Sequence, residues 1–179
     1  MKSFLELAAA RQSDRVYEPG RVIEREVLGR ILEAGRLAPS ACNGQPWHFT
    51  VVTEPALLAM VGKATSSLGM NKFVKDASAL VLITLELTNI TSKLGCCIKD
   101  KDFPMMDLGI ASAYITLAAE DEGVGSCILG WFDEKKIKEL VGIPQKKRLM
   151  LIISLGYNTK PKRRKIRKEF DKVVSFEKY

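Results

Sequence analysis

The sequence predicts an α/β layered domain of the α+β class, formed by one chain of 179 residues. Short runs rich in valine, isoleucine and leucine alternate with longer segments whose apolar residues recur at helical spacing. The composition suits a globular protein with a core, since 46% of the residues are apolar and 27% are charged. The strand-like runs are too few for a β-sandwich. No repeat or linker divides the chain, so we expect a single domain over residues 1–179.

The first half of the chain predicts two helices followed by a strand, a helix and a strand. Helices are expected over residues 2–10 and about 24–36, and the second ends because Pro39 keeps Ala38 out of the helical region. The other elements expected here are a strand at HFTVVT (48–53), a helix that Pro55 begins and that ends near residue 66, and a buried strand at SALVLITLEL (78–87). Residues 88–103 are expected to form a loop that could act as a lid.

A long helix is expected over about 104–121, and it is apolar or small on nearly every face. Such a helix must be buried on most sides, which is easier in a small domain if a second copy of the chain covers one face. The small residues Gly109, Ala111, Ser112 and Ala113 would allow another helix to approach closely. We therefore expect a homodimer, with a central core helix in a monomer as the alternative.

The last third of the chain predicts a strand, a short helix, a strand and a basic tail. VGSCILGWF (124–132) and RLMLIISLGY (148–157) have the composition of strands. Between them, Asp133 is placed to cap a helix that ends at Gly142 and Pro144.

The net charge of +7 is concentrated in one stretch. KPKRRKIRK, residues 160–168, holds seven basic residues, and the rest of the chain carries 21 basic and 21 acidic residues. A nucleic-acid-binding arm is one explanation, but the sequence has no RRM, helix-turn-helix or zinc-finger signature. We therefore expect no nucleic-acid partner, and the stretch requires a local explanation.

The sequence lacks the signatures of several other kinds of binding site and of membrane or secreted proteins. Neither GxGxxG nor GxxxxGK[ST] occurs, and the four cysteines include no CxxC pair, so neither a Rossmann site, a P-loop nor a metal site is expected. We expect the thiols to be reduced and mostly packed, and the single histidine, His48, to be structural or incidental. No apolar run is long enough to span a membrane and no signal peptide is evident, so we expect a cytoplasmic protein without a membrane partner.

Two polar motifs are candidates for ligand binding. In RQSDR, the alternating residues Arg11, Ser13 and Arg15 can present two guanidinium groups and a hydroxyl to a phosphate, although a solvated surface is the alternative. In APSACNGQPWHF, the side chains of Ser40, Asn43 and Gln45 offer uncharged donors and acceptors suited to the edge of a heteroaromatic ring. The alternative for this loop is a helix-to-strand turn whose polar side chains bond its own backbone.

Together and in this order, these motifs resemble the FMN-dependent nitroreductase family. RQSDR is similar to its R-x-S-x-R element and PSACNGQPW to its P-S-x-x-N-x-Q-P-W element. MDLGIASAYITLAAEDEGVGSC, GWFDEKKIKELVGIP with ISLGYNTKP, and KIRKEFDKVV resemble its later segments, so the likeness covers nearly the whole chain. The central segment TNITSKLGCCIKDKDF has no counterpart that we can assign, and Cys96 and Cys97 lie within it.

The resemblance implies a central, mostly antiparallel sheet flanked by helices, an intertwined homodimer, and FMN at the interface. It assigns Arg11, Gln12, Ser13 and Arg15 to the phosphate and ribityl chain, joined by Lys165 and Arg167 from a basic tail over 157–179. It assigns Pro39, Ser40, Ala41, Asn43 and Gln45 of the partner subunit to the isoalloxazine side, Leu129 and Gly130 to backbone contacts near flavin N5, and Asn71 to a cofactor contact.

The activity implied is reduction of nitroaromatics, quinones or related small electrophiles by NADH or NADPH, with ping-pong hydride transfer through flavin N5. No side-chain acid or base is required, so no catalytic residue is expected. The alternatives are a specialised flavin dehydrogenase or dehalogenase of the same family, a flavin-binding protein without turnover, and the basic nucleic-acid-binding protein. The physiological acceptor, the choice of nicotinamide and the surplus basic residues of 160–168 stay open.

Overall fold

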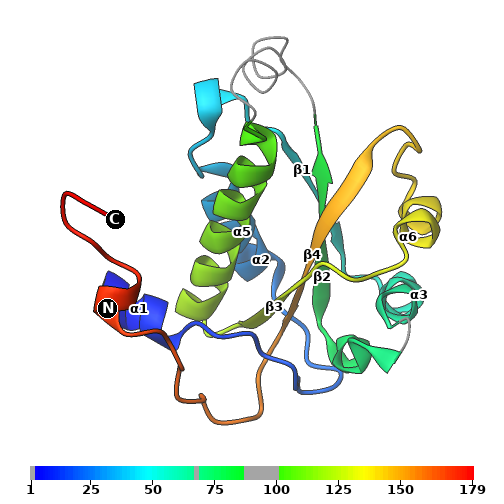
Figure 1. The fold of residues 1–179 in the computed structure, drawn as a ribbon. Helices are drawn as coiled ribbons and strands as arrows, with labels where there is room; N and C mark the ends of the chain where they lie inside the picture. Colours follow the sequence, from blue (N-terminus) through cyan, green and yellow to red (C-terminus); the bar gives the residue numbers. More distant parts are fainter. Residues whose placement is uncertain (1–2, 67–68, 87–100) are drawn as a thin grey trace.

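The computed structural model describes residues 3–66, 69–86 and 101–179, and its core is one four-stranded sheet between two helical layers (Figure 1). The strands are β1 (Trp47–Val52), β2 (Ala79–Leu85), β3 (Gly125–Leu129) and β4 (Arg148–Gly156). Their order in the sheet is β1-β2-β4-β3, and each neighbouring pair is antiparallel. The expected antiparallel sheet flanked by helices is therefore confirmed.

Helices α2 (Arg25–Arg36) and α5 (Phe103–Asp121) cover one face of the sheet, and α3 (Pro55–Thr65) and α6 (Glu134–Val141) cover the other (Figure 1). The two faces arise from the alternation of side chains along the strands. In β2, Val81 and Ile83 join the apolar cluster that contains Ile115 of α5. Leu80 and Leu82 join the other cluster, toward α3 and α6. Both faces of β2 are buried, which explains why its sequence is apolar except for Thr84.

The predicted helices and strands are present, and their ends differ from the predicted ones by at most a few residues. The first helix, α1 (Phe4–Ala10), begins with a capping box in which Ser3 and Glu6 bond each other's backbone N–H. Three short 3-10 turns were not expected: η1 (Ala41–Asn43), η3 (Lys72–Asp76) and η4 (Phe170–Lys172). The loop expected over 88–103 lies outside the described residues up to residue 100, and Cys96 and Cys97 lie outside them too.

Among the residues that the structure describes, those of helix α5 are buried on one side of the helix and exposed on the other. Ala111, Ser112 and Ile115 are buried within the chain itself. Gly109 and Ala113 are exposed, and beside them the larger side chains of Met106, Ile110 and Tyr114 are 54%, 37% and 41% exposed. Ala111 and Ser112 lie on the side that α2 and the sheet of the same chain cover, so only Gly109 and Ala113 are free to face a helix of a second copy.

A glycine in α2 sets how closely α2 and α5 pack. A Cβ on Gly35 would lie 2.5 Å from Cγ1 and 2.8 Å from Cδ1 of the fully buried Ile115. Gly29 lies in the same helix but is exposed, and a Cβ there would meet no atom within 4 Å. The two glycines thus differ in packing while sharing one helical backbone.

We expect Gly35→Ala to lower the free energy of unfolding by about 1–3 kcal/mol, because the added methyl group overpacks the α2–α5 contact. Gly29→Ala should instead raise it by about 0.5–1 kcal/mol, because alanine favours the helix and meets no neighbour. Urea unfolding of both variants measures the difference. Shifts of the same sign and size in the two variants would contradict this packing role for Gly35.

Candidate functional site

The residues that follow α1 lie along the edge of the sheet. The Asp14 N–H donates to the Ser126 carbonyl at 2.9 Å, and Ser13 forms a parallel bridge with Ser126 at the outer side of β3. Two residues with no side chain make this approach possible. A Cβ on Gly125 would lie 2.9 Å from Oδ2 of Asp14, and one on Gly156 would lie 2.8 Å from the ring of Tyr17.

Tyr17 ties this segment to the core. Its side chain is buried, its hydroxyl lies 3.2 Å from the Ser154 carbonyl and 2.9 Å from Ser154 Oγ, and its ring packs near Phe73. Burial raises the pKa of the Tyr17 hydroxyl, so it stays a neutral donor. Residues 11–15 are therefore held at the sheet by a backbone bridge at one end and a buried aromatic anchor at the other.

The basic tail returns to the same place. The Arg163 N–H donates to Oε1 of Gln12 at 3.0 Å, and the Arg163 guanidinium donates to the Ser13 carbonyl at 2.8 Å. The Lys165 ammonium donates to the carbonyl of Ala8 in α1. The two basic stretches, about 150 residues apart in sequence, therefore lie side by side. Part of the surplus charge now has an explanation, since Arg163 holds the tail in place.

The two stretches enclose a cavity of about 400 Å³, which we call the basic cavity. It is lined by Arg11, Gln12, Ser13, Arg15, Arg163, Arg164, Lys165, Ile166 and Arg167. Six of these residues are among those predicted from the sequence, and Arg163, Arg164 and Ile166 are not. The pKa of Lys165 is lowered by burial and then by the positive charges of Arg11 and Arg167. Such a concentration of like charge favours a bound anion.

The basic cavity adjoins β3, which ends at Leu129. Ser13 and Arg15 lie close enough to the Cys127 thiol to influence its ionisation. Burial raises the pKa of this thiol and Arg15 opposes the shift, so Cys127 is a packed thiol, as expected. Cys42, in contrast, is exposed. From Ser126 to Leu129 the strand advances about 10 Å, so an elongated ligand with its anionic end in the cavity can reach Leu129 and Gly130.

The polar loop, residues 39–46, has a tightly constrained backbone. Cys42, Asn43 and Gln45 have positive φ angles of 51°, 51° and 45°, a conformation that costs energy for residues other than glycine. The N–H of Ala41 donates to both carboxylate oxygens of Asp107 in α5, at 3.1 and 3.2 Å. Asp107 is 6% exposed and was not predicted as a site residue; its signal in the sequence is an acid within an otherwise apolar helix.

Some side chains of the polar loop bond the loop itself. Ser40 Oγ accepts from the Gln45 N–H at 2.9 Å, and the Gln45 side-chain amide donates to the carbonyl and Oδ1 of Asn43 at 3.2 and 3.1 Å. The alternative of a self-bonded turn is therefore partly correct. Asn43 and Gln45 are nevertheless exposed, as is Pro39.

Within one chain the polar loop and the basic cavity lie at opposite ends of α5 (Figure 1). The loop is held by Asp107, and the tail is held by Glu120, whose Oε2 lies 2.5 Å from the ammonium of Lys162. The two acids are 13 positions apart in the helix, which corresponds to a rise of about 20 Å. The structure thus brings the N-terminal and C-terminal candidate residues together, but not the loop residues of the same chain.

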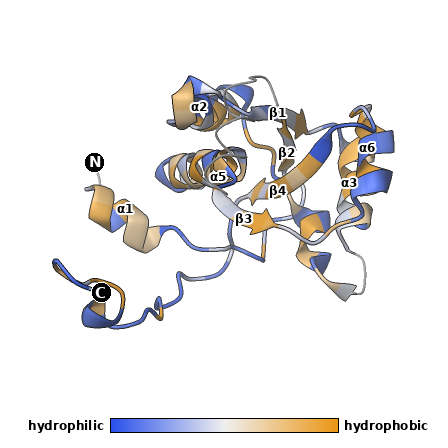
Figure 2. Ribbon diagram, turned by 45° about the horizontal axis from the view of Figure 1, so that its top comes forward, coloured by the Kyte–Doolittle hydropathy of each residue, from blue (hydrophilic) through white to orange (hydrophobic). Residues whose placement is uncertain are grey.

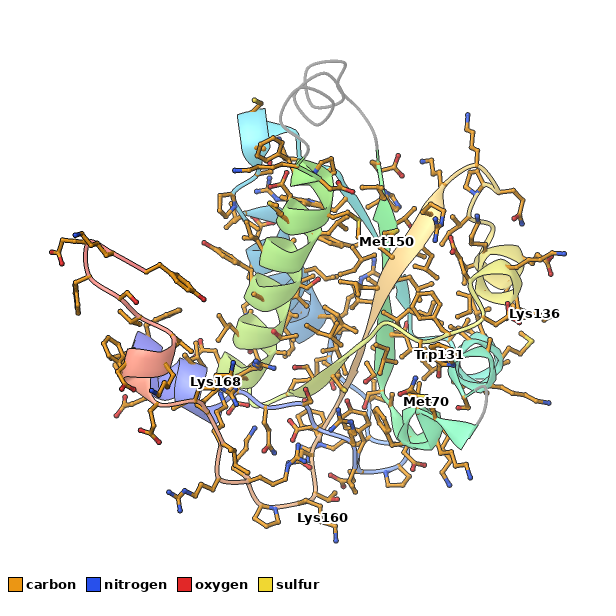
Figure 3. All side chains as sticks on the ribbon, in the orientation of Figure 1. Met70, Trp131, Lys136, Met150, Lys160 and Lys168 are labelled. Carbon is orange, nitrogen blue, oxygen red and sulfur yellow. The ribbon has the colours of Figure 1, made fainter. Side chains whose placement is uncertain are left out.

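Asn71 joins two segments of the chain near the C-terminal end of β3. It adopts a left-handed conformation with φ of 56°, and its amide nitrogen donates to the carbonyls of Thr65 and Trp131 at 3.2 and 3.0 Å. This links the end of α3 to the loop after Gly130. The exposed side chains of Trp131 and Met70 lie in the same region (Figure 3). Direct contact between Asn71 and a cofactor stays a prediction.

Within the part of the chain that the structure describes, no helix is long and apolar enough to cross a membrane. The model of the Nitroreductase family matches residues 8–157. A protein of Archaeoglobus fulgidus, provisionally named an NADH dehydrogenase/NAD(P)H nitroreductase, is 34% identical over 161 residues, which cover 88% of this chain and 86% of that protein.

Two further proteins are similar over most of their length. The solved structure of an FMN-dependent nitroreductase from Clostridium difficile R20291 has a TM-score of 0.80 and 27% identity, covering 98% of this chain and 100% of that one. The iodotyrosine deiodinase of Thermotoga neapolitana is 25% identical over 184 residues, with 90% of this chain and 92% of that protein covered. The resemblance seen in the motifs is confirmed by these matches, and the chain belongs to the nitroreductase family of oxidoreductases.

Proposed function

We propose that the protein is an FMN-dependent oxidoreductase that uses NADH or NADPH to reduce nitroaromatics, quinones or related small electrophiles in the cytoplasm. The observation that carries this proposal is the basic cavity, in which two distant segments supply six cationic side chains and a hydroxyl beside the edge of β3. This donor set fits FMN, since a phosphate suits the cations and an elongated ligand can reach Gly130. The similarity to an FMN-dependent nitroreductase and to a protein named an NAD(P)H nitroreductase supports the same cofactor and reductant.

In this site the chain holds and orients the cofactor. Arg11, Arg15 and Arg167 bind the phosphate with permanently charged donors, and Ser13 adds a hydroxyl. The side-chain amide of Gln12 is hydrogen-bonded to Asp14 and to the N–H of Arg163, so its role is to hold the two segments of the site together. FMN supplies the hydride chemistry when it is bound, and the protein needs no side-chain acid or base of its own. Leu129 and Gly130 offer backbone groups to the ring edge.

We further propose a homodimer in which each flavin site uses both chains. The exposed apolar face of α5, with Met106, Ile110 and Tyr114, needs a cover. Helix α1 and the C-terminal segment extend from the body and expose Phe4, Leu5 and further apolar side chains (Figure 2). The polar loop lies too far from the cavity of its own chain, so Ser40, Asn43 and Gln45 serve the site of the partner, together with Pro39 and Ala41.

Three alternatives to this function are considered. Dehalogenation is a second candidate, because one relative is named an iodotyrosine deiodinase; an acceptor screen should therefore include iodotyrosine. A nucleic-acid-binding arm is disfavoured, because Arg163 and Lys165 donate hydrogen bonds to backbone carbonyls of the N-terminal segment. A flavin-binding protein without turnover would take up FMN but would fail to consume NADH or NADPH with any acceptor.

Purified protein, or protein incubated with FMN, should be yellow. NADH or NADPH should bleach the flavin absorption without air, and a quinone or nitroaromatic should restore it, since both half-reactions use one site. Absorption spectroscopy under nitrogen measures this. Protein that stays colourless after incubation with FMN would end the proposal.

Arg11→Ala and Arg15→Ala should each weaken FMN binding about 10- to 100-fold, because each removes a charge-assisted contact with the phosphate. Fluorescence titration of apoprotein with FMN measures the dissociation constant, and light scattering should show an unchanged oligomeric state. Arg25→Ala, at an exposed arginine of α2, is the control and should bind FMN like the wild type. Unchanged affinity in both cavity variants would refute the assignment.

Ile110→Arg should convert the protein to monomers and reduce FMN retention at the same time, because it places a charge on the exposed apolar face of α5. Size-exclusion chromatography with light scattering gives the mass, and the ratio of absorbance at 450 and 280 nm gives the bound flavin. Met60→Arg alters a similarly exposed apolar residue on α3 and should leave both unchanged. A dimeric, flavin-loaded Ile110→Arg variant would contradict the proposed interface.

A further inference from the structure

Two buried carboxylates lie next to the basic cavity, and one lysine joins them. The ammonium of Lys162 is 2.5 Å from Oε2 of Glu120 and 3.7 Å from Oδ2 of Asp14. Asp14 is 2% exposed and Glu120 is 7% exposed. Buried ionised carboxylates are strongly disfavoured unless they are paired, so Lys162 compensates two charges that would otherwise be costly in this position.

The lysine offsets an unfavourable feature in the position of each acid. Glu120 lies in the last turn of α5, where the helix dipole disfavours negative charge. Oδ2 of Asp14 is enclosed and has no hydrogen-bond partner among the described residues, while Oδ1 accepts from the Gln12 amide at 2.7 Å. Lys162 is therefore the ion-pair partner that the geometry provides for this oxygen.

These contacts form a closed ring of ion-pair and hydrogen-bond partners next to the basic cavity. Lys162 pairs with Asp14, Asp14 accepts from Gln12, and Gln12 accepts from the N–H of Arg163, the residue after Lys162. Arg163 lines the basic cavity, whereas the side chain of Lys162 turns away to the end of α5. The ring thus places the wall of the cavity relative to the N-terminal segment.

We propose that Lys162 is a positioning residue for the flavin site. By joining Glu120 and Asp14 it anchors the C-terminal basic segment to α5, and FMN retention depends on this anchor although Lys162 does not bind the phosphate. The proposal rests on the proposed function, because it assumes that the basic cavity holds FMN. The proposal also implies coupling, because the Lys162 ion pairs and FMN hold the same C-terminal basic segment. The ion pairs therefore favour FMN binding, and bound FMN favours the position of the segment in which the ion pairs form.

Lys162→Met should weaken FMN binding at least tenfold, while Lys162→Arg, which keeps the charge, should stay within about threefold of the wild type. Lys168→Met removes an equal charge from an exposed position of the same segment and is the matched control (Figure 3). Adding Glu120→Gln to Lys162→Met should recover part of the lost affinity, because it removes the buried negative charge with which Lys162 is paired. Titration of each apoprotein with FMN gives the dissociation constants, and thermal melting of the apoproteins tests whether the fold is intact.

Limited trypsin digestion tests the coupling in the unmodified protein. FMN should slow cleavage after the basic residues of 162–168, as resolved by mass spectrometry, and this protection should be smaller in Lys162→Met. Equal FMN affinities of Lys162→Met and Lys168→Met would overturn the proposal, and so would an unchanged cleavage rate in wild-type protein saturated with FMN. Wild-type protein that binds no FMN would instead refute the proposed function, so the two failures are distinguishable.

Discussion

Close packing of residues 13–17 against the edge of the sheet determines the position of everything else at the candidate site. The approach requires glycine at 125 and 156, since a methyl group at either position would overlap Asp14 or the Tyr17 ring. The Tyr17 hydroxyl then fixes the segment to the core through Ser154. Because the segment is held on this side, its arginines face the returning tail, and the basic cavity forms between them.

Helix α5 organises both halves of the site with an acid near each end. Asp107, in the second turn, accepts from the Ala41 N–H and thereby holds the polar loop, in a position that the helix dipole favours. Glu120, in the last turn, is disfavoured by the dipole and is paired with Lys162. The helix between these acids is packed on one side against its own chain and leaves the other side apolar and exposed. Function and assembly therefore depend on one element.

Much of the fold and part of the site could be predicted from the sequence. Apolar periodicity identifies the helices and the strands because burial dictates it locally, and Arg11, Ser13 and Arg15 stand out because their chemistry suits an anion. The roles of Asp107, Glu120 and Lys162 could not be predicted, because their partners lie 42 to 148 residues away and only the topology brings them together. The burial of Ala111 and Ser112 within the chain could not be predicted either, because composition alone does not show which side of an apolar helix the same chain covers.

The central claim is that each flavin site combines the basic cavity of one chain with the polar loop of its partner. Mixing two variants tests it most directly: one with Arg11→Ala and Arg15→Ala, the other with Asn43→Ala and Gln45→Ala, unfolded together and refolded as hybrids. Each variant alone should bind FMN poorly, and we expect the mixture to regain about a quarter of the wild-type sites, because half of the dimers are hybrids with one intact site. If the cavity and loop of the same chain formed each site, no hybrid would contain an intact one, and a mixture that regains no FMN binding would contradict the claim.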